Sequence, residues 1–191
     1  MGPQSYICDA AARVWAPWLA PGELETLRRG GYYATLIAPG LRFVAVNTVF
    51  YMKADRETAA DPDPAGQLAW LETVLRTSAE AGERVYLAGH VPPGCYERWV
   101  HRCLMTADRA KRFLSIVAKY AKAVVAQFYG HYHSDTFRIA GDGSPPSSFA
   151  PTSVLFIAPA LTPWSIINNP AIRQFRCVAC FLAAAVMGFC C

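Results

Sequence analysis

The chain has 191 residues, of which 53% are apolar and 17% are charged, and it carries a net charge of +4 at pH 7. This length suits one domain with a substantial core, and the apolar share excludes an intrinsically disordered chain. The densest basic stretch, residues 109–122, interleaves Lys and Arg with apolar residues, as an amphipathic helix with a solvated basic face does. The mild charge therefore does not favour a nucleic-acid partner.

Turn-forming and capping residues divide the first half of the chain into helices and strands. Pro21-Gly22 and Gly30-Gly31 bound a short helix. Asp63 as N-cap and Gly82 bound a longer helix, in which apolar residues recur at helical spacing. Aromatic and β-branched residues on both sides of a Pro-Gly turn predict two strands. In chain order, the expected elements are a helix over 23–29, strands over 32–37 and 41–49, a polar loop over 53–63 and a helix over 64–81.

The second half of the chain alternates apolar runs with helical and turn-rich segments. The expected elements are strands over 84–88, 124–129, 135–139 and 154–158, a helix over 106–122, and loops over 95–105 and 141–148. Strands that alternate with helices predict an open α/β sheet, and such sheets place their functional sites at the carboxyl ends of the strands.

Three of the four histidines lie in two motifs that follow predicted strands, Gly89-His90-Val91-Pro92-Pro93-Gly94 and Gly130-His131-Tyr132-His133. In an extended segment side chains alternate between faces, so His131 and His133 would project the same way, with His90 arriving from a neighbouring strand end. Neutral imidazole suits zinc, manganese or iron. We therefore expect a metal site. The competing reading of a His-x-His pair is a surface or packed pair, and His101, which lies in no motif, is expected to be such a histidine.

The seven cysteines are many for a cytosolic chain of this length and favour an oxidising compartment. They lack the paired CxxC spacing of a structural zinc site, and the single CxxC, Cys177 to Cys180, is weak support for metal or redox work. An odd total leaves at least one thiol unpaired or intermolecular. Residues 1–9 have neither the basic nor the apolar region of a signal peptide.

Residues 177–191 form an uncharged, apolar, cysteine-rich tail, which we separate from a domain over residues 1–176. The tail is shorter than the ~20 residues that a helix needs to span a bilayer. It could be a buried helix, an interfacial membrane anchor with acylated cysteines, or an exposed sticky segment.

With these motifs in hand, the chain resembles the acid sphingomyelinase-like branch of the calcineurin-like metallophosphoesterases. The matching stretches run from about Ser5 to Arg176 and include residues 15–19, 30–33, 47–48, 63–71, 126–135, 162–164 and 168–173, together with the His90 motif. The resemblance implies a metallophosphoesterase-like layered β-sheet core flanked by helices, α/β in class. It also implies that residues 1–176 are the C-terminal part of the catalytic domain, so that the domain is truncated.

The resemblance implies a centre of two zinc ions about 3.5–4 Å apart that activates a water and clamps a phosphoryl group. By this resemblance, His90 and His131 are ligands of one ion and His133 is a ligand of the other. The family also uses an Asp-x-His motif, a bridging carboxylate and an Asn-His pair, and this sequence contains no Asp-x-His and no Asn-His. Asp135 is expected to cap a turn or orient an imidazole rather than to replace the bridging carboxylate.

Two hypotheses of different class follow. The first is a metal-dependent phosphodiesterase that hydrolyses a phosphoric diester of a lipid or a nucleotide, secreted or at the cell surface or in endolysosomes, as the resemblance implies. The second is a non-catalytic fragment that acts through a partner or a membrane. The missing motifs favour the second hypothesis for the isolated chain, and the first describes the complete protein.

Overall fold

The computed structural model describes residues 5–141, 146–162 and 169–176. Its helices are α1 (Tyr6–Trp15), α2 (Pro21–Gly30), α3 (Gln67–Glu80) and α4 (Ala107–Lys119), with short 3-10 helices at Thr48–Tyr51, Pro64–Gly66 and Pro146–Ser148. Its strands are β1 (Tyr33–Ala38), β2 (Leu41–Ala45), β3 (Arg84–Ala88), β4 (Cys95–Tyr96), β5 (Trp99–Cys103), β6 (Val124–Tyr129), β7 (Thr136–Gly141) and β8 (Pro151–Ile157).

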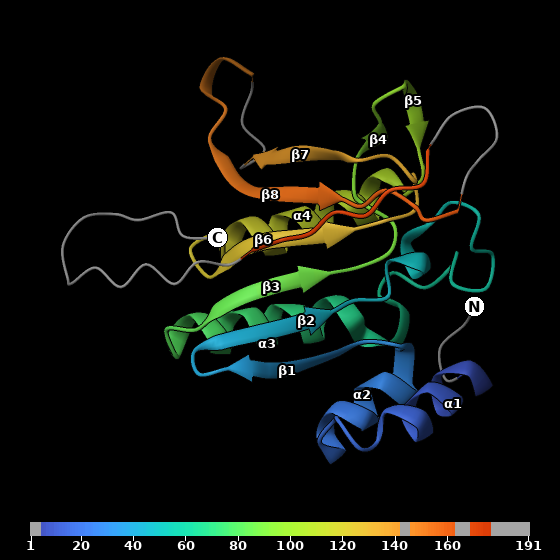
Figure 1. The fold of residues 1–191 in the computed structure, drawn as a ribbon, viewed down its shortest axis with the longest axis vertical. Helices are drawn as coiled ribbons and strands as arrows, with labels where there is room; N and C mark the ends of the chain where they lie inside the picture. The colour runs from blue at the N-terminus through green and yellow to red at the C-terminus, as the bar shows by residue number, and fades with distance from the viewer. Residues whose placement is uncertain (1–4, 142–145, 163–168, 177–191) are drawn as a thin grey trace.

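Six of these strands form one sheet in the order β1-β2-β3-β6-β8-β7 (Figure 1). The four central strands, β2, β3, β6 and β8, are parallel, and the edge strands β1 and β7 are antiparallel to their neighbours. The expected α/β class is confirmed. Because the central strands are parallel, the segments that leave β3 and β6 emerge at the same edge of the sheet.

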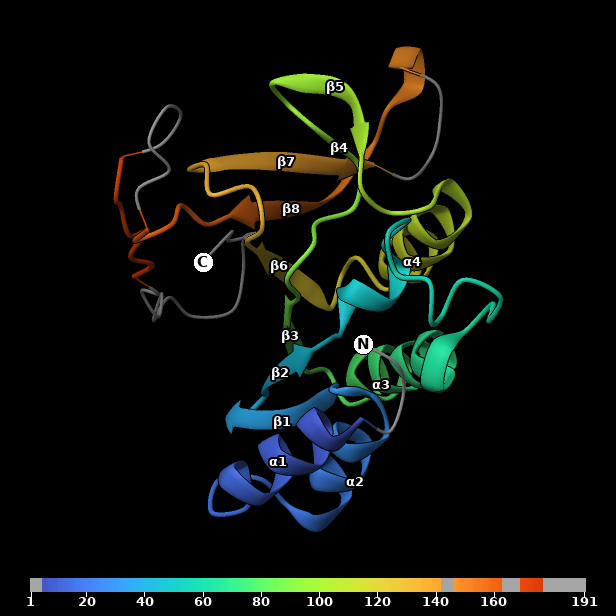
Figure 2. The same ribbon diagram turned by 90° about the vertical axis from the view of Figure 1, so that its right-hand side faces the viewer.

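Helices α3 and α4 cover one face of the sheet, as Figure 2 shows. Apolar residues at helical spacing on α3 and a matching stripe on α4 pack on the sheet. The residues of this core that are at most 1% exposed include Leu68, Leu71, Leu75, Val85, Leu87, Phe113 and Val117. Burying one such side chain contributes about 1.5–3 kcal/mol. The packed core therefore stabilises the central strands and fixes the points where the following loops begin.

The opposite face of the sheet is lined by aromatic side chains. The ring of Phe128 lies 5.6 Å from that of Tyr86 and 5.9 Å from that of Phe156, measured between centroids. Phe175 packs on both Phe128 and Phe156, at 4.9 and 5.1 Å. Figure 1 shows the segment 169–176 crossing in front of the sheet. Edge-on contacts between rings thus fix the last described segment on this face.

Three local features differ from the expectations. Helix α1 was not expected, although the side chain of Ser5 caps it by accepting from Cys8 N. The strand expected over 41–49 ends at Ala45, because Asn47 accepts from Val49 N and starts a 3-10 helix. The loop expected over 95–105 contains the hairpin β4–β5, closed by the disulfide Cys95–Cys103.

Two expectations concern the ends of the chain. The tail over 177–191 lies outside the described residues, so the readings of it stay predictions. Within the part of the chain that the structure describes, no helix has the length and apolar character needed to cross a membrane.

Candidate metal centre

The loop that carries His90 is held by the neighbouring strand β6 and by Thr48 in the 3-10 helix after β2. After β3, Gly89 N donates to Phe128 O at 3.0 Å, and the backbone N–H groups of His90 and Val91 both donate to Thr48 Oγ1, at 3.0 and 2.7 Å. Thr48 is fully buried. A Cβ atom on Gly89 would lie 2.7 Å from Thr48 Cγ2, so only glycine fits between strand and threonine.

The loop that carries His131 and His133 leaves β6 next to the first loop, and Gly130 N donates to His90 O at 3.0 Å. The φ angles of His131 and His133 are 70° and 56°, in the left-handed region. The prediction that this segment is extended and alternates its side chains is therefore wrong. Histidine tolerates this region better than most residues, yet each such position stores roughly 1–3 kcal/mol and needs support from its surroundings.

The two loops bring two imidazoles into contact. His131 Nδ1 lies 3.0 Å from His90 Nε2, and the rings are nearly perpendicular with centroids 5.0 Å apart. His133 lies close enough for its charge to act on both rings. The predicted convergence of the motifs is thus met by His90 and His131.

Burial lowers the pKa of His90 below its ordinary value, and the charge of His133 lowers it further. The pKa of His131 is lowered first by burial and then by the charges of His90 and His133. Both shifts favour the neutral imidazole, which is the form whose ring nitrogen can bind a metal.

The pair fits one divalent ion. Imidazole nitrogens lie about 2.0–2.1 Å from zinc, and two nitrogens 3.0 Å apart can both reach one ion at that distance. Among the residues that the structure describes, no group of three or more His, Cys, Asp and Glu is arranged to hold a metal. The structure therefore brings His90 and His131 together, and the ligand roles of His90, His131 and His133 stay predictions.

The other two polar residues considered in the sequence, Asp135 and His101, make no recorded contact with the His90–His131 pair. Asp135, 56% exposed, forms an ion pair with Arg173 on the segment that crosses the sheet, so its expected role in orienting an imidazole stays a prediction. His101 is exposed on β5, as a surface histidine would be. The sequence did not identify Thr48 as the residue that supports the His90 loop. Its position just after a strand gave no hint that its hydroxyl accepts from another loop.

A hollow of about 450 Å³ opens beside His90 and is lined mainly by apolar and aromatic side chains. Its lining includes Trp15 and Ile7 from α1, and Tyr33 and Phe43 from the sheet. The centre of paired imidazoles thus adjoins an apolar space large enough for part of a small molecule.

The chain is similar to known phosphodiesterases. It is 35% identical over 188 residues to a sphingomyelinase phosphodiesterase C of Dictyostelium discoideum, which covers 92% of this chain and 41% of that protein. It is 35% identical to the Homo sapiens acid sphingomyelinase-like phosphodiesterase 3b, over 89% of this chain and 39% of that protein. It is 36% identical to a Homo sapiens cyclic GMP-AMP phosphodiesterase, over 90% of this chain and 39% of that protein.

The chain thus spans about two fifths of the length of these relatives. No family model matches it. A solved structure of PhoD matches the fold with a TM-score of 0.51 at 16% identity, covering 80% of this chain and 33% of that chain. The similarity to the relatives runs through nearly the whole sequence, and the chain belongs to the acid sphingomyelinase-like phosphodiesterase family.

Proposed function

We propose that this chain carries the histidine part of a metal centre that hydrolyses phosphoric diesters. The observation that supports this most is the contact of His90 with His131, whose ring nitrogens lie 3.0 Å apart where β3 and β6 end. Relatives that match about nine-tenths of the chain are named as phosphodiesterases. Hydrolysis of a phosphoric diester accounts both for the paired imidazoles and for the similarity to phosphodiesterases.

Each histidine has a role in this proposal. His90 and His131 bind one divalent ion through the nitrogens that face each other, and His133 binds a second, with zinc as the proposed metal. Divalent ions bound there would lower the pKa of a coordinated water and polarise a phosphoryl oxygen. The chain itself supplies neutral imidazoles, and Thr48 fixes the loop of His90 so that its ring stays in place.

The same residues provide neither a bridging carboxylate nor a general acid. Asp135 is paired with Arg173, and His101 is exposed on the hairpin. We therefore propose that hydrolysis needs further ligands, and that this chain alone is inactive. The alternative, a non-catalytic fragment that acts through a partner or a membrane, is favoured by the lack of a three-ligand group among the described residues.

The substrate class is proposed from the relatives alone, whose names mention sphingomyelin and cyclic GMP-AMP. We propose a lipid or nucleotide diester, with the hollow beside His90 holding its apolar or aromatic part. The Cys95–Cys103 disulfide favours an oxidising compartment, consistent with a secreted, cell-surface or endolysosomal protein.

Calorimetric titration with zinc and turnover of a chromogenic phosphodiester together test the proposal. We expect the chain to bind zinc, His131→Ala to lose most of that binding, and His101→Ala to keep it. Turnover should not exceed that of buffer with the same zinc. Zinc binding that is equal in the wild type and His131→Ala would reject the metal centre. Turnover that His131→Ala removes would show instead that the chain carries a complete site.

A further inference from the structure

The loop over residues 130–134 has hydrogen bonds of its own, from Tyr132 N to Gly130 O and from Ser134 Oγ to Tyr132 O, but its two strained histidines need further support. His131 and His133 are both in the left-handed region, where a residue with a Cβ atom is strained. Between them lies Tyr132, which is only 7% exposed. Whatever holds the Tyr132 side chain therefore holds the backbone conformation that aims the two histidines.

The side chain that holds Tyr132 comes from the hairpin β4–β5. The rings of Tyr96 and Tyr132 are stacked, with centroids 4.5 Å apart and planes 15° apart. The hydroxyl of Tyr96 also lies 3.1 Å from Ser134 Oγ. Tyr96 thus contacts the residue on each side of His133, and stacked aromatic pairs of this kind are specific in geometry.

The hairpin in turn depends on its disulfide. A single two-stranded hairpin is marginally stable in water, and β4 has only two residues. Cys95, next to Tyr96, is bonded to Cys103 across the strand pair. The bond closes the hairpin at its base, so Tyr96 is held close to the histidine loop.

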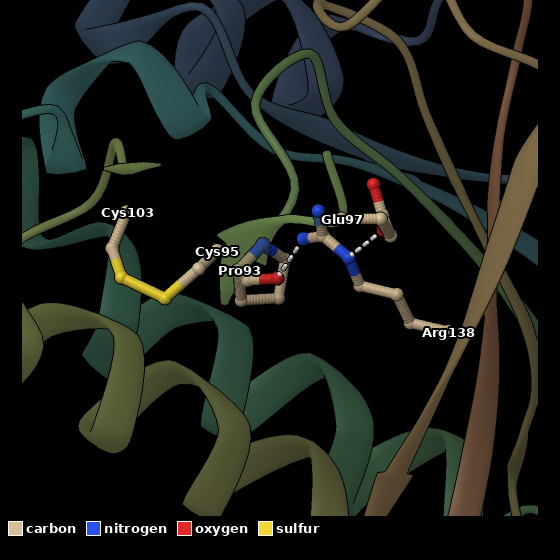
Figure 3. The surroundings of a disulfide bond; sticks show 5 residues. All are labelled: Pro93, Cys95, Glu97, Cys103 and Arg138. Atoms are coloured by element: carbon tan, nitrogen blue, oxygen red, sulfur yellow. Dashed lines mark hydrogen bonds and ion pairs between the residues drawn. A yellow bond between two sulfur atoms is a disulfide. The ribbon is translucent and has the colours of Figure 1, made fainter. Parts of the chain in front are cut away.

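Arg138 on β7 joins the hairpin to both histidine loops. Its guanidinium donates from Nε to Glu97 Oε1 at 2.5 Å and from Nη1 to Pro93 O at 2.6 Å. It also lies 5.1 Å from the centroid of the Tyr132 ring. Figure 3 shows Arg138 reaching Pro93 and Glu97 beside the disulfide. One side chain therefore contacts the His90 motif, the hairpin and the residue between His131 and His133.

We propose that the disulfide-closed hairpin β4–β5 is a positioning element for the metal centre, with Tyr96 as the residue that sets the conformation of the His131–His133 loop. This inference rests on the metal centre proposed above. It assigns to Tyr96 no contact with a metal or a substrate. The hairpin acts through the stacked tyrosines, as outer residues that orient metal ligands do.

The test compares the affinity for Zn2+ and the backbone hydrogen exchange of residues 130–134 without metal in six proteins. These are the wild type, Tyr96→Ala, Tyr96→Phe, Cys95→Ser/Cys103→Ser, His131→Ala and the control Arg102→Ala. Arg102 lies on the same hairpin but faces Trp99, with its guanidinium carbon 5.8 Å from the centroid of that ring. Circular dichroism of each protein establishes that the sheet is folded.

We expect Tyr96→Ala to weaken Zn2+ binding by roughly 10–100-fold, the range seen when outer-shell partners are lost. Exchange of residues 130–134 should become faster in the same variant. The double cysteine variant should change in the same direction, whereas Tyr96→Phe should restore most of the affinity because the stack remains. Arg102→Ala should match the wild type in both measurements.

Two outcomes would overturn the proposal, and they are distinguishable. If His131→Ala loses Zn2+ binding while Tyr96→Ala binds and exchanges like the wild type, the metal centre exists and the hairpin does not position it. If His131→Ala binds Zn2+ as the wild type does, the metal centre itself is rejected, and with it the role of the hairpin in metal binding.

Discussion

The two histidine-bearing loops present the same kind of side chain with different kinds of support. The His90 loop is held through its backbone, because two N–H groups donate to the buried hydroxyl of Thr48. The His131–His133 loop is held through a side chain, because Tyr132 is stacked on Tyr96. The first support comes from the fully buried Thr48 of the 3-10 helix that follows β2, and the second comes from the hairpin β4–β5 outside the six-stranded sheet.

This difference predicts how each loop responds to the loss of its support. Support through buried backbone groups is tied to the stability of the whole sheet, because an unsatisfied N–H there destabilises the fold. Support through a stacked ring lies on an element outside the six-stranded sheet, so it can fail while the sheet stays folded. Changes at the first loop should therefore appear in global stability, and changes at the second in local order.

The largest expected effect on stability comes from Thr48→Val. Valine has nearly the same shape but accepts no hydrogen bond, so two N–H groups lose their partner. At about 1–3 kcal/mol for each unsatisfied group, we expect the free energy of unfolding to fall by about 2–6 kcal/mol. Urea denaturation measures it.

The matched control is Thr73→Val on the exposed side of α3, where the threonine hydroxyl donates to Ala69 O within the helix. It should change the free energy of unfolding by less than about 0.5 kcal/mol. Equal effects at the two threonines would show that the backbone support of the His90 loop is not a distinct feature.

A smaller effect is expected from Arg138→Met, which removes the donors to Pro93 O and to the Glu97 carboxylate while keeping the apolar stem. We expect the free energy of unfolding to fall by about 1.5–3 kcal/mol, the range for hydrogen bonds that involve a charge.

Arg76→Met is the control, because Arg76 forms an exposed ion pair with Glu80 one turn away, worth about 0.3–0.5 kcal/mol. Thermal unfolding of both variants would compare them. A loss at Arg138 no larger than that at Arg76 would mean that Arg138 does not join the loops.

Much of the fold was predictable from the sequence because its signals are local. The helix from Gln67 to Glu80 shows helical spacing of apolar residues. It starts later than expected and its N-cap residue is Gly66, but Asp63 does accept from the backbone N–H groups of Leu68 and Ala69. The strands from Arg84 to Ala88 and from Val124 to Tyr129 are short apolar runs with the expected bounds. Parallel pairing then brings His90 and His131 to one edge.

The features that sequence reasoning missed depend on contacts between distant segments. The positive φ of His131 and His133 is supported by the stack of Tyr132 on Tyr96, thirty-six residues earlier in the chain. The hairpin that carries Tyr96 has a strand of two residues, too short for an alternating pattern, and its disulfide partner could not be assigned from spacing. The strand pattern therefore located the candidate ligand loops but could not give the conformation of the histidines in them.

The pH dependence of stability should separate the paired histidines from the rest of the chain. Because the pKa values of His90 and His131 are lowered in the folded protein, the unfolded chain binds more protons. The stability from the neutral pair is complete above the unfolded pKa of about 6.5 and is lost as the pH falls through that value toward the folded pKa values. Without metal, the melting temperature should fall on going from pH 7.5 to 5.5.

His90→Gln should reduce this pH dependence, and His101→Ala on the exposed hairpin should leave it unchanged. A melting temperature that falls equally in the two variants would place the titrating groups outside the pair.

The smallest effect is expected from Tyr132→Phe, and it tests whether the second loop depends on the ring or on the hydroxyl. Tyr132 Oη is buried and makes no hydrogen bond of regular geometry among the described residues, although the Arg138 side chain acts on it, so removing it should cost little. The stack on Tyr96 and the contact of the ring with Arg138 remain. We expect the free energy of unfolding to change by less than about 1 kcal/mol, and hydrogen exchange in the loop to stay as in the wild type.

Tyr132→Ala, which removes the ring, should accelerate the hydrogen exchange of this loop. If the phenylalanine variant exchanged as fast as the alanine variant, the hydroxyl rather than the stack would hold the loop, and the contrast between backbone support at His90 and ring support at His131 would no longer stand.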